Sequence, residues 1–197
     1  MNLKKRINWF YLAIFSFTIL LFSHYFLQKY LFMQPCEQCV YIRFAIFAIF
    51  IGSIISFLSP KLRILGYIFG QYGVILGISS SLHLMKIKNA ISGDDFFGLR
   101  GCSMEPKFLL NIPFDKLCPA MFAPTGDCGY DAPVVPKDSV LTNLQSYFIN
   151  LYNDGWYLIP QKQFLNIAQT SLILFIFFEI IFIFALFFEF KHNKITK

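Results

Sequence analysis

The stretch VYIRFAIFAIFIGSIISFL, residues 40–58, decides the fold because its 19 residues carry a single formal charge, that of Arg43. A helix needs roughly 20 mainly apolar residues to cross about 30 Å of lipid hydrocarbon. Charged residues make up 14% of the whole chain, against about 25% in an ordinary soluble domain. The stretch therefore predicts a transmembrane helix, in a protein with much of its surface facing lipid.

Three more stretches have the same character. Trp9–Leu27 and Ile64–Met85 contain no Asp, Glu, Lys or Arg, and Ile167–Phe188 contains only Glu179. The first stretch is too long for the apolar core of a signal peptide and has no A-x-A-like cleavage site after it, so we expect it to be retained. The sequence thus predicts one membrane domain, residues 1–197, with spans at about 9–27, 40–58, 64–85 and 167–188.

The cations indicate the orientation of these spans. Eight of the 17 Lys and Arg residues lie in three short segments that alternation places on one face: Lys4, Lys5, Arg6, Lys61, Arg63, Lys191, Lys194 and Lys197. Because cytoplasmic loops carry the excess of Lys and Arg, we expect both termini in the cytoplasm and the loops at about 28–39 and 86–166 in the periplasm. The net charge of +6 then reflects topology, and no nucleic-acid partner is expected.

All five cysteines fall on the predicted outer side or at its membrane boundary: Cys36, Cys39, Cys102, Cys118 and Cys128. Disulfides persist in such an oxidising compartment, so the distribution indicates redox chemistry or structural bridging. A Cys-x-x-Cys sequence is also half of a zinc site, but no second closely spaced Cys or His pair completes one here. We therefore expect no metal.

The first two cysteines stand where a helix is expected to begin. Pro35 disfavours helix in the residue before it, and a cysteine at a helix N-terminus has its thiolate stabilised by the positive end of the helix dipole. Arg43 follows Cys39 by four residues and so lies on the same helix face, one turn deeper. An arginine within a span suggests a functional site, although this one is near enough to the boundary to extend outward to water instead.

The long outer loop has two parts. Residues 86–138 are rich in Pro and Gly and hold three cysteines, which indicates irregular chain tied by a disulfide. Residues 139–152 place apolar side chains at helical spacing, and these are Val140, Leu141, Leu144, Phe148, Leu151 and Tyr152. We expect a short helix there, lying in the membrane interface or packed against the rest of the loop. The predicted fold is an all-α membrane protein, a four-helix transmembrane bundle with a large disulfide-tied periplasmic loop containing this interfacial helix.

Two features within the spans favour packing over chemistry. The third span carries glycines four apart, Gly66 with Gly70 and Gly73 with Gly77, a spacing that lets helix backbones approach closely in lipid. Glu179 would be costly as a bare charge in the fourth span, so we expect it to be neutral or paired inside the bundle.

Taken together, CEQC followed by VYIR at residues 36–43, His83, and the segment GCSMEPKFLLNIPFDKLCPAMFAPTGDCGYDAP at residues 101–133 resemble the DsbB/DsbI family of disulfide-bond formation proteins. The likeness is nearly chain-wide, and the second loop looks closer to the DsbI branch. Members are bacterial inner-membrane enzymes that pass electrons from a periplasmic thiol oxidase to quinone. The resemblance implies a quinone-dependent protein thiol–disulfide oxidoreductase, with a DsbA-like thiol oxidase, membrane lipid and the quinone pool as partners.

The resemblance also implies roles for the cysteines. Cys36 and Cys39 match the redox pair that reacts with quinone, and Cys102 and Cys128 match the pair that reacts with the thiol oxidase. In that scheme the oxidase attacks at Cys102, Cys128 is freed to attack Cys36, and Cys39 is left as the thiolate beside quinone. Cys118 departs from the DsbB pattern, and a bridge from Cys102 to Cys118 would disturb this relay.

For the cofactor, the resemblance implies that Arg43 and His83 bind quinone, either ubiquinone or menaquinone. A non-enzymatic alternative is a disulfide-stapled membrane scaffold whose outer loop binds a periplasmic partner without redox turnover. A vitamin-K-reductase-like enzyme also combines Cys-x-x-Cys with quinone, but its pair is expected late in the chain, whereas here the pair is early.

Overall fold

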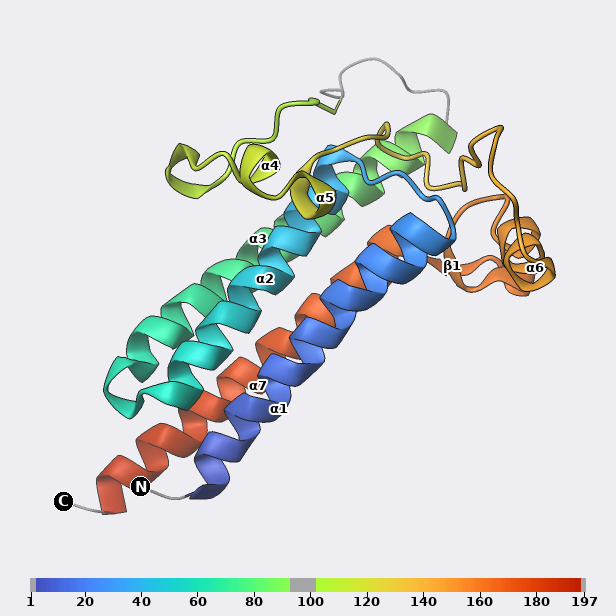
Figure 1. Ribbon diagram of the computed structural model, residues 1–197. Helices are drawn as coiled ribbons and strands as arrows, with labels where there is room; N and C mark the ends of the chain where they lie inside the picture. The colour runs from blue at the N-terminus through green and yellow to red at the C-terminus, as the bar shows by residue number, and fades with distance from the viewer. Residues whose placement is uncertain (1–2, 93–101, 196–197) are drawn as a thin grey trace.

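The computed structural model describes residues 3–92 and 102–195, and its long helices lie alongside one another as a bundle (Figure 1). The elements are α1 (Leu3–Leu21) with a π-helical continuation (Phe22–Tyr30), α2 (Glu37–Leu58), a 3₁₀ turn (Pro60–Leu62), α3 (Arg63–Ser92), a 3₁₀ turn (Leu109–Asn111), α4 (Phe114–Leu117), α5 (Pro119–Phe122), α6 (Asn143–Leu151), β1 (Tyr157–Ile159), a 3₁₀ turn (Pro160–Lys162), β2 (Phe164–Asn166) and α7 (Ile167–Ile195). Lys197 of the cation pattern and residues 93–101 of the long loop lie outside the described residues.

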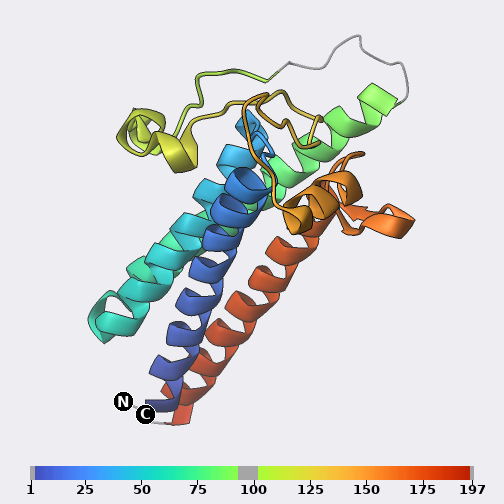
Figure 2. The ribbon, with the colours of Figure 1, turned by 45° about the vertical axis from the view of Figure 1, so that its right-hand side comes forward.

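The predicted fold class is confirmed. In the described part of the chain, 4 helices are long and apolar enough to cross a membrane: Ile7–Tyr30, Glu37–Leu58, Arg63–Ile91 and Ile167–Ala185. Figures 1 and 2 place both termini and the α2–α3 turn at one end of the bundle, here called the terminal end. Residues 102–166, the described part of the chain between α3 and α7, lie at the other end, here called the loop end.

Small residues let α3 approach both of its neighbours. A side chain at Gly66 would collide with the backbone carbonyl of Gly52 on α2, and one at Gly70 would collide with the ring of Phe182 on α7. These contacts confirm the packing role predicted for the glycines. In lipid the hydrophobic effect does not drive helices together, so they associate through the close packing that small residues allow.

Polar side chains also join α3 to α7 within the bundle. Gln71 Nε2 donates a hydrogen bond of 2.6 Å to Glu179 Oε2, and the hydroxyls of Ser81 and Ser171 lie 2.9 Å apart. The predicted pairing of Glu179 is therefore confirmed, because an interhelical hydrogen bond spares its carboxyl group from apolar surroundings.

The predicted short loop helix is present as α6. Its Phe148 ring packs edge-on against Phe26 and Tyr30 in the π-helical continuation of α1. On the same helix Leu144 is 64% exposed and Tyr147 59% exposed, so α6 packs through one side and leaves apolar side chains open on another. Contact of this open side with lipid stays a prediction.

Candidate functional site

The Cys36–Cys39 pair is built into the start of α2. Cys36 is the N-cap residue, and its Sγ accepts a hydrogen bond of 3.3 Å from the Cys39 backbone N–H. The two sulfurs lie 2.9 Å apart, with Cys36 as donor. Because a disulfide has an S–S separation of about 2.05 Å, a small movement of either side chain brings the two sulfurs to bonding distance, and an acceptor of two electrons and two protons would then convert the dithiol to a disulfide.

The surroundings of Cys36 hold its proton. The hydrogen bond to Cys39, together with burial, raises the pKa of the Cys36 thiol well above its ordinary value. Cys36 retains 2% of its surface exposed, so it is screened from bulk water. In the reduced pair, Cys36 therefore donates the S–H hydrogen bond and the Cys39 sulfur accepts it.

Arg43 lies one turn below this pair and is buried, with 6% of its surface exposed. Its Nη1 donates 2.7 Å to Gln28 Oε1 and 3.4 Å to the Met121 carbonyl, and its Nη2 donates 3.1 Å to the Ser23 carbonyl. Ser23 and Gln28 both belong to the π-helical continuation of α1, a geometry often found at functional sites. The guanidinium is thus fixed across the bundle and does not extend outward to water.

A cavity of about 160 Å³ opens beside these groups, and Cys36, Cys39 and Arg43 all line it. Most of its remaining wall is apolar and comes from α1, α2, α7 and the loop, including Ile19, Ile42, Ile46, Trp156 and Leu174. His83 is half-buried on α3. Its neighbour Leu84 lines the cavity and His83 itself does not.

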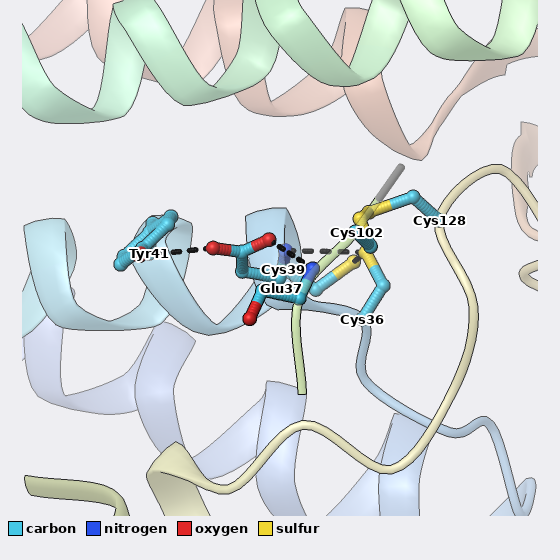
Figure 3. Close-up of a disulfide and its surroundings, with 7 residues drawn as sticks. Cys36, Glu37, Cys39, Tyr41, Cys102 and Cys128 are labelled. Atoms are coloured by element: carbon cyan, nitrogen blue, oxygen red, sulfur yellow. Dashed lines mark hydrogen bonds between the residues drawn. A yellow bond between two sulfur atoms is a disulfide. The ribbon is translucent and has the colours of Figure 1, made fainter. Parts of the chain in front are cut away.

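The other two predicted site cysteines form a disulfide. Cys102 and Cys128 are bridged with their Cα atoms 5.8 Å apart, within the ordinary range for such a bond. Cys118 is an exposed thiol between α4 and α5, so the alternative Cys102–Cys118 bridge is not the one formed. Figure 3 draws the bridge next to the Cys36–Cys39 pair.

Backbone hydrogen bonds bring the Cys128 arm of the loop against the first loop. The N–H groups of Thr125 and Gly126 donate 2.8 and 3.1 Å to the carbonyl of Pro35, the residue before Cys36. Further along, Met33 and Pro133 form an antiparallel bridge. The chain that carries Cys128 is therefore held against the residues that precede Cys36.

The Cys102 arm is attached through side chains of α2. The backbone N–H of Ser103 donates 2.6 Å to Glu37 Oε2, and the Tyr41 hydroxyl donates 3.1 Å to Glu37 Oε1. That hydroxyl also accepts a 2.8 Å hydrogen bond from the Lys107 backbone N–H. These contacts, part of which Figure 3 shows, hold the chain after Cys102 on the helix that carries Cys36 and Cys39.

The arrangement brings two cysteine pairs, one arginine and one cavity to the loop end of the bundle. Thiol–disulfide exchange proceeds by thiolate attack on a disulfide sulfur. Cys36 and Cys128 belong to one buried cluster, with Cys39 and Cys102 packed against it, so the arrangement suits exchange within the chain. Among the described residues, no group of three or more His, Cys, Asp or Glu side chains is placed to hold a metal ion.

Sequence reasoning missed the groups that position these residues. Gln28, the acceptor for Arg43, falls in a stretch that the sequence predicts as loop. Glu37 stands inside the Cys-x-x-Cys motif, and no role was predicted for its carboxylate from the sequence. Lys88 and Asp131, which form an ion pair at the cavity, gave no sign in the sequence that they would meet.

Comparisons with known proteins agree with this geometry. The sequence model of the family described as "Disulfide bond formation protein DsbB" matches residues 5–187. The chain is 43% identical over 180 residues to the protein-disulfide oxidoreductase DsbI of Salmonella typhimurium, covering 87% of this chain and 80% of that protein. It is 42% identical over 172 residues to the putative protein-disulfide oxidoreductase DsbI of Campylobacter fetus, covering 86% and 80%. The corresponding protein of Campylobacter jejuni is 37% identical over 203 residues, covering 96% and 76%.

The match covers most of the chain, so the chain belongs to the DsbB family and is a multi-pass membrane protein-disulfide oxidoreductase.

Proposed function

We propose that this member of the DsbB family reoxidises a DsbA-like periplasmic thiol oxidase and delivers the electrons to membrane quinone. The balanced reaction consumes two partner thiols and one quinone and yields one partner disulfide and one quinol, with two electrons and two protons transferred. The observation that carries the proposal is the apolar cavity that Cys36, Cys39 and Arg43 all line.

The cavity fits the ring of a quinone. An apolar cavity of about 150 Å³ in another protein holds one benzene ring, and this cavity measures about 160 Å³. Arg43 is a permanent donor on its wall, suited to a carbonyl oxygen, and the apolar side chains suit a hydrophobic ring. Bound there, quinone supplies a two-electron, two-proton acceptor next to the sulfurs.

Each cysteine pair then has one task. The partner's thiolate attacks Cys102, opens the Cys102–Cys128 bridge and leaves a mixed disulfide. With the Cys36–Cys39 pair in its disulfide form, the Cys128 thiolate attacks Cys36, so the Cys36–Cys39 bond breaks and Cys39 leaves as a thiolate. The partner's second thiolate attacks the mixed disulfide and releases Cys102, and Cys102 then attacks Cys128, which restores the Cys102–Cys128 bridge and leaves both electrons on the Cys36–Cys39 pair as two thiols. Arg43 holds a positive charge one turn from Cys39, which stabilises the thiolate on that sulfur.

His83 remains the second residue proposed for quinone binding. Its place on α3 next to the cavity-lining Leu84 supports a role at the edge of the site, although successive residues of a helix point about 100° apart. A His83→Gln variant tests it: an unchanged Michaelis constant for quinone would remove His83 from the site.

The proposed location is the bacterial inner membrane, with both termini in the cytoplasm and the long loop in the periplasm. The cation excess near the terminal end supports this orientation. Lys61 lies in the turn between α2 and α3, and Arg63 begins α3, at the end that both chain termini share (Figure 1). Reporter fusions at the C-terminus test it, and a periplasmic signal there would reject the orientation.

The decisive experiment measures quinone reduction by the purified protein in detergent, with a reduced DsbA-like partner and either ubiquinone or menaquinone. Cys39→Ala and Cys102→Ala are each expected to abolish turnover. Cys118→Ala is the matched control, because Cys118 is exposed and unbridged, and it should keep turnover. Failure of the unaltered protein to reduce any quinone, with its Cys102–Cys128 bridge intact, would overturn the proposal.

A further inference from the structure

The chain that follows Cys128 is fixed to α3 by an ion pair that the exchange scheme does not use. Lys88 Nζ lies 2.9 Å from Asp131 Oδ1 and 3.1 Å from Asp131 Oδ2. The side chains are 17% and 15% exposed, so the pair is mostly shielded from water. Shielding strengthens the attraction, and removing one partner of a shielded ion pair is costly.

The Asp131 carboxylate also binds a third segment of the chain. The Trp156 backbone N–H donates 3.3 Å to Asp131 Oδ2. Gly155 approaches the carboxylate so closely that a side chain there would collide with Asp131, and its φ of 107° is one that favours glycine. Asp131 therefore joins α3, the Cys128 arm and the turn before β1, and Trp156 forms part of the cavity wall.

Cys128 sits between two anchored points of its arm. On one side, Thr125 and Gly126 are hydrogen-bonded to the Pro35 carbonyl. On the other, Gly129, with φ of 89°, lies so close to α3 that a side chain would collide with Ile91, and the Asp131 ion pair follows directly.

We propose that the Lys88–Asp131 ion pair is the positioning element that keeps Cys128 within reach of Cys36 once the Cys102–Cys128 bridge has opened. This inference rests on the proposed function for its place in the cycle, although the geometry that it predicts is independent of quinone. Lys88 and Asp131 are positioning residues here, and they act through the chain that carries Cys128.

The step that depends on this position is one thiol–disulfide exchange. Cys128, freed as a thiolate, attacks Cys36 Sγ, so the Cys36–Cys128 bond forms and the Cys36–Cys39 bond breaks. The electron pair of the broken bond remains on Cys39 as a thiolate. Because a misplacement of about 1 Å can cost on the order of 100-fold in rate, a Cys128 arm released from α3 should react far more slowly.

The test measures formation of the Cys36–Cys128 disulfide without quinone or partner. In the full chain carrying Cys39→Ala, Cys102→Ala and Cys118→Ala, only those two thiols remain, and diamide oxidises them by accepting two electrons and two protons. Disulfide formation is followed by thiol trapping and peptide mapping. Adding Lys88→Met or Asp131→Asn should slow it about 10- to 100-fold.

Matched variants separate positioning from general loosening. Lys88→Arg keeps the ion pair and should restore the rate. Lys88→Met with Asp131→Asn should slow the reaction by less than the product of the two single effects, because the two changes share the ion pair, although Asp131 also accepts from the Trp156 N–H and Lys88 also lies over the Tyr157 ring. The exposed neighbours Lys86 and Asp127 supply the controls, and Lys86→Met and Asp127→Asn should leave the rate unchanged.

An unchanged rate in Lys88→Met, or no rescue by Lys88→Arg, would overturn the inference. Since the reaction involves no quinone, a chain that fails to reduce quinone and yet shows the expected slowing would reject the proposed function alone. A chain that reduces quinone and shows no slowing would reject the ion-pair inference alone.

Discussion

The two cysteine pairs are held in place in different ways. Cys36 and Cys39 are three residues apart on the first turn of α2, so the helix itself sets their spacing. Cys102 and Cys128 are 26 residues apart, and hydrogen bonds that their arms donate to the Glu37 carboxylate and the Pro35 carbonyl hold these arms against α2 and the first loop. The first pair is rigid by local structure, whereas the second is placed by long-range contacts. This difference matches the proposed tasks, since one pair meets a fixed cavity and the other must meet a separate protein.

The largest expected effect distinguishes the two cysteine pairs by the reductant, partner protein or small dithiol, that still drives quinone reduction when one pair is lost. Cys39→Ala should lower quinone reduction by roughly a thousandfold or more with either a protein thiol or a small dithiol, because it removes the pair at the cavity. Cys102→Ala should lose turnover with the partner protein only, since a small dithiol reaches Cys36 and Cys39 without it. Quinone absorbance measures both, and equal loss with both reductants in Cys102→Ala would contradict the division of tasks.

Loss of the arginine should have the next largest effect. Arg43→Met removes the donor for Gln28 Oε1 and the Ser23 carbonyl, and a charge-assisted hydrogen bond contributes about 1.5–3 kcal/mol. We expect catalytic efficiency for quinone to fall about 10- to 100-fold, measured by steady-state kinetics. Lys61→Met, at the exposed terminal end, is the control, and an equal loss there would remove the specific role of Arg43.

A smaller effect is expected where the Cys102 arm meets α2. Glu37→Ala leaves the Ser103 N–H and the Tyr41 hydroxyl without their acceptor. Because Ser103 is exposed, water replaces much of what is lost, and a net contribution of about 0.5–1.5 kcal/mol corresponds to a decrease of about 2- to 10-fold in partner-driven turnover. Glu105→Ala on the same arm should have no effect, and a similar decrease there would refute the tether.

The smallest change is a shift in pH dependence within the first pair. Since the hydrogen bond to Cys39 and burial raise the pKa of Cys36, Cys36 stays a thiol at pH values where an ordinary cysteine, with a pKa of about 8.5, is half ionised. Alkylation of Cys36 in the reduced protein should therefore keep rising with pH above that value. Cys39→Ala should move the rise to lower pH, because the hydrogen bond is gone. Mass spectrometry of trapped peptides measures this, and identical profiles would contradict the assignment.

Features set by local sequence were the ones predicted from it. Four apolar stretches identified the spans, and Pro35 identified the start of α2 at the first cysteine pair. The partners of Arg43 were not predictable in this way, because Gln28 and Met121 lie 15 and 78 residues from it in the chain. The π-helical continuation that carries Gln28 was also missed, since polar residues at a span end resemble a loop. The Lys88–Asp131 contact depends on how the long loop folds back, which periodicity does not report.

The carbonyl of Pro35 has a consequence for the energetics of the cycle. A disulfide stabilises a protein mainly by restricting the loop that it closes, by about 3–4 kcal/mol for a loop of this size when the loop is otherwise free. Here hydrogen bonds to the Pro35 carbonyl and the Glu37 carboxylate also hold the two arms, independently of the covalent connection between them. Opening the Cys102–Cys128 bridge therefore gives the loop little extra conformational entropy. Re-forming the bridge, in turn, takes little of that entropy away. The loop can open and close once per turnover without the bundle having to refold around it.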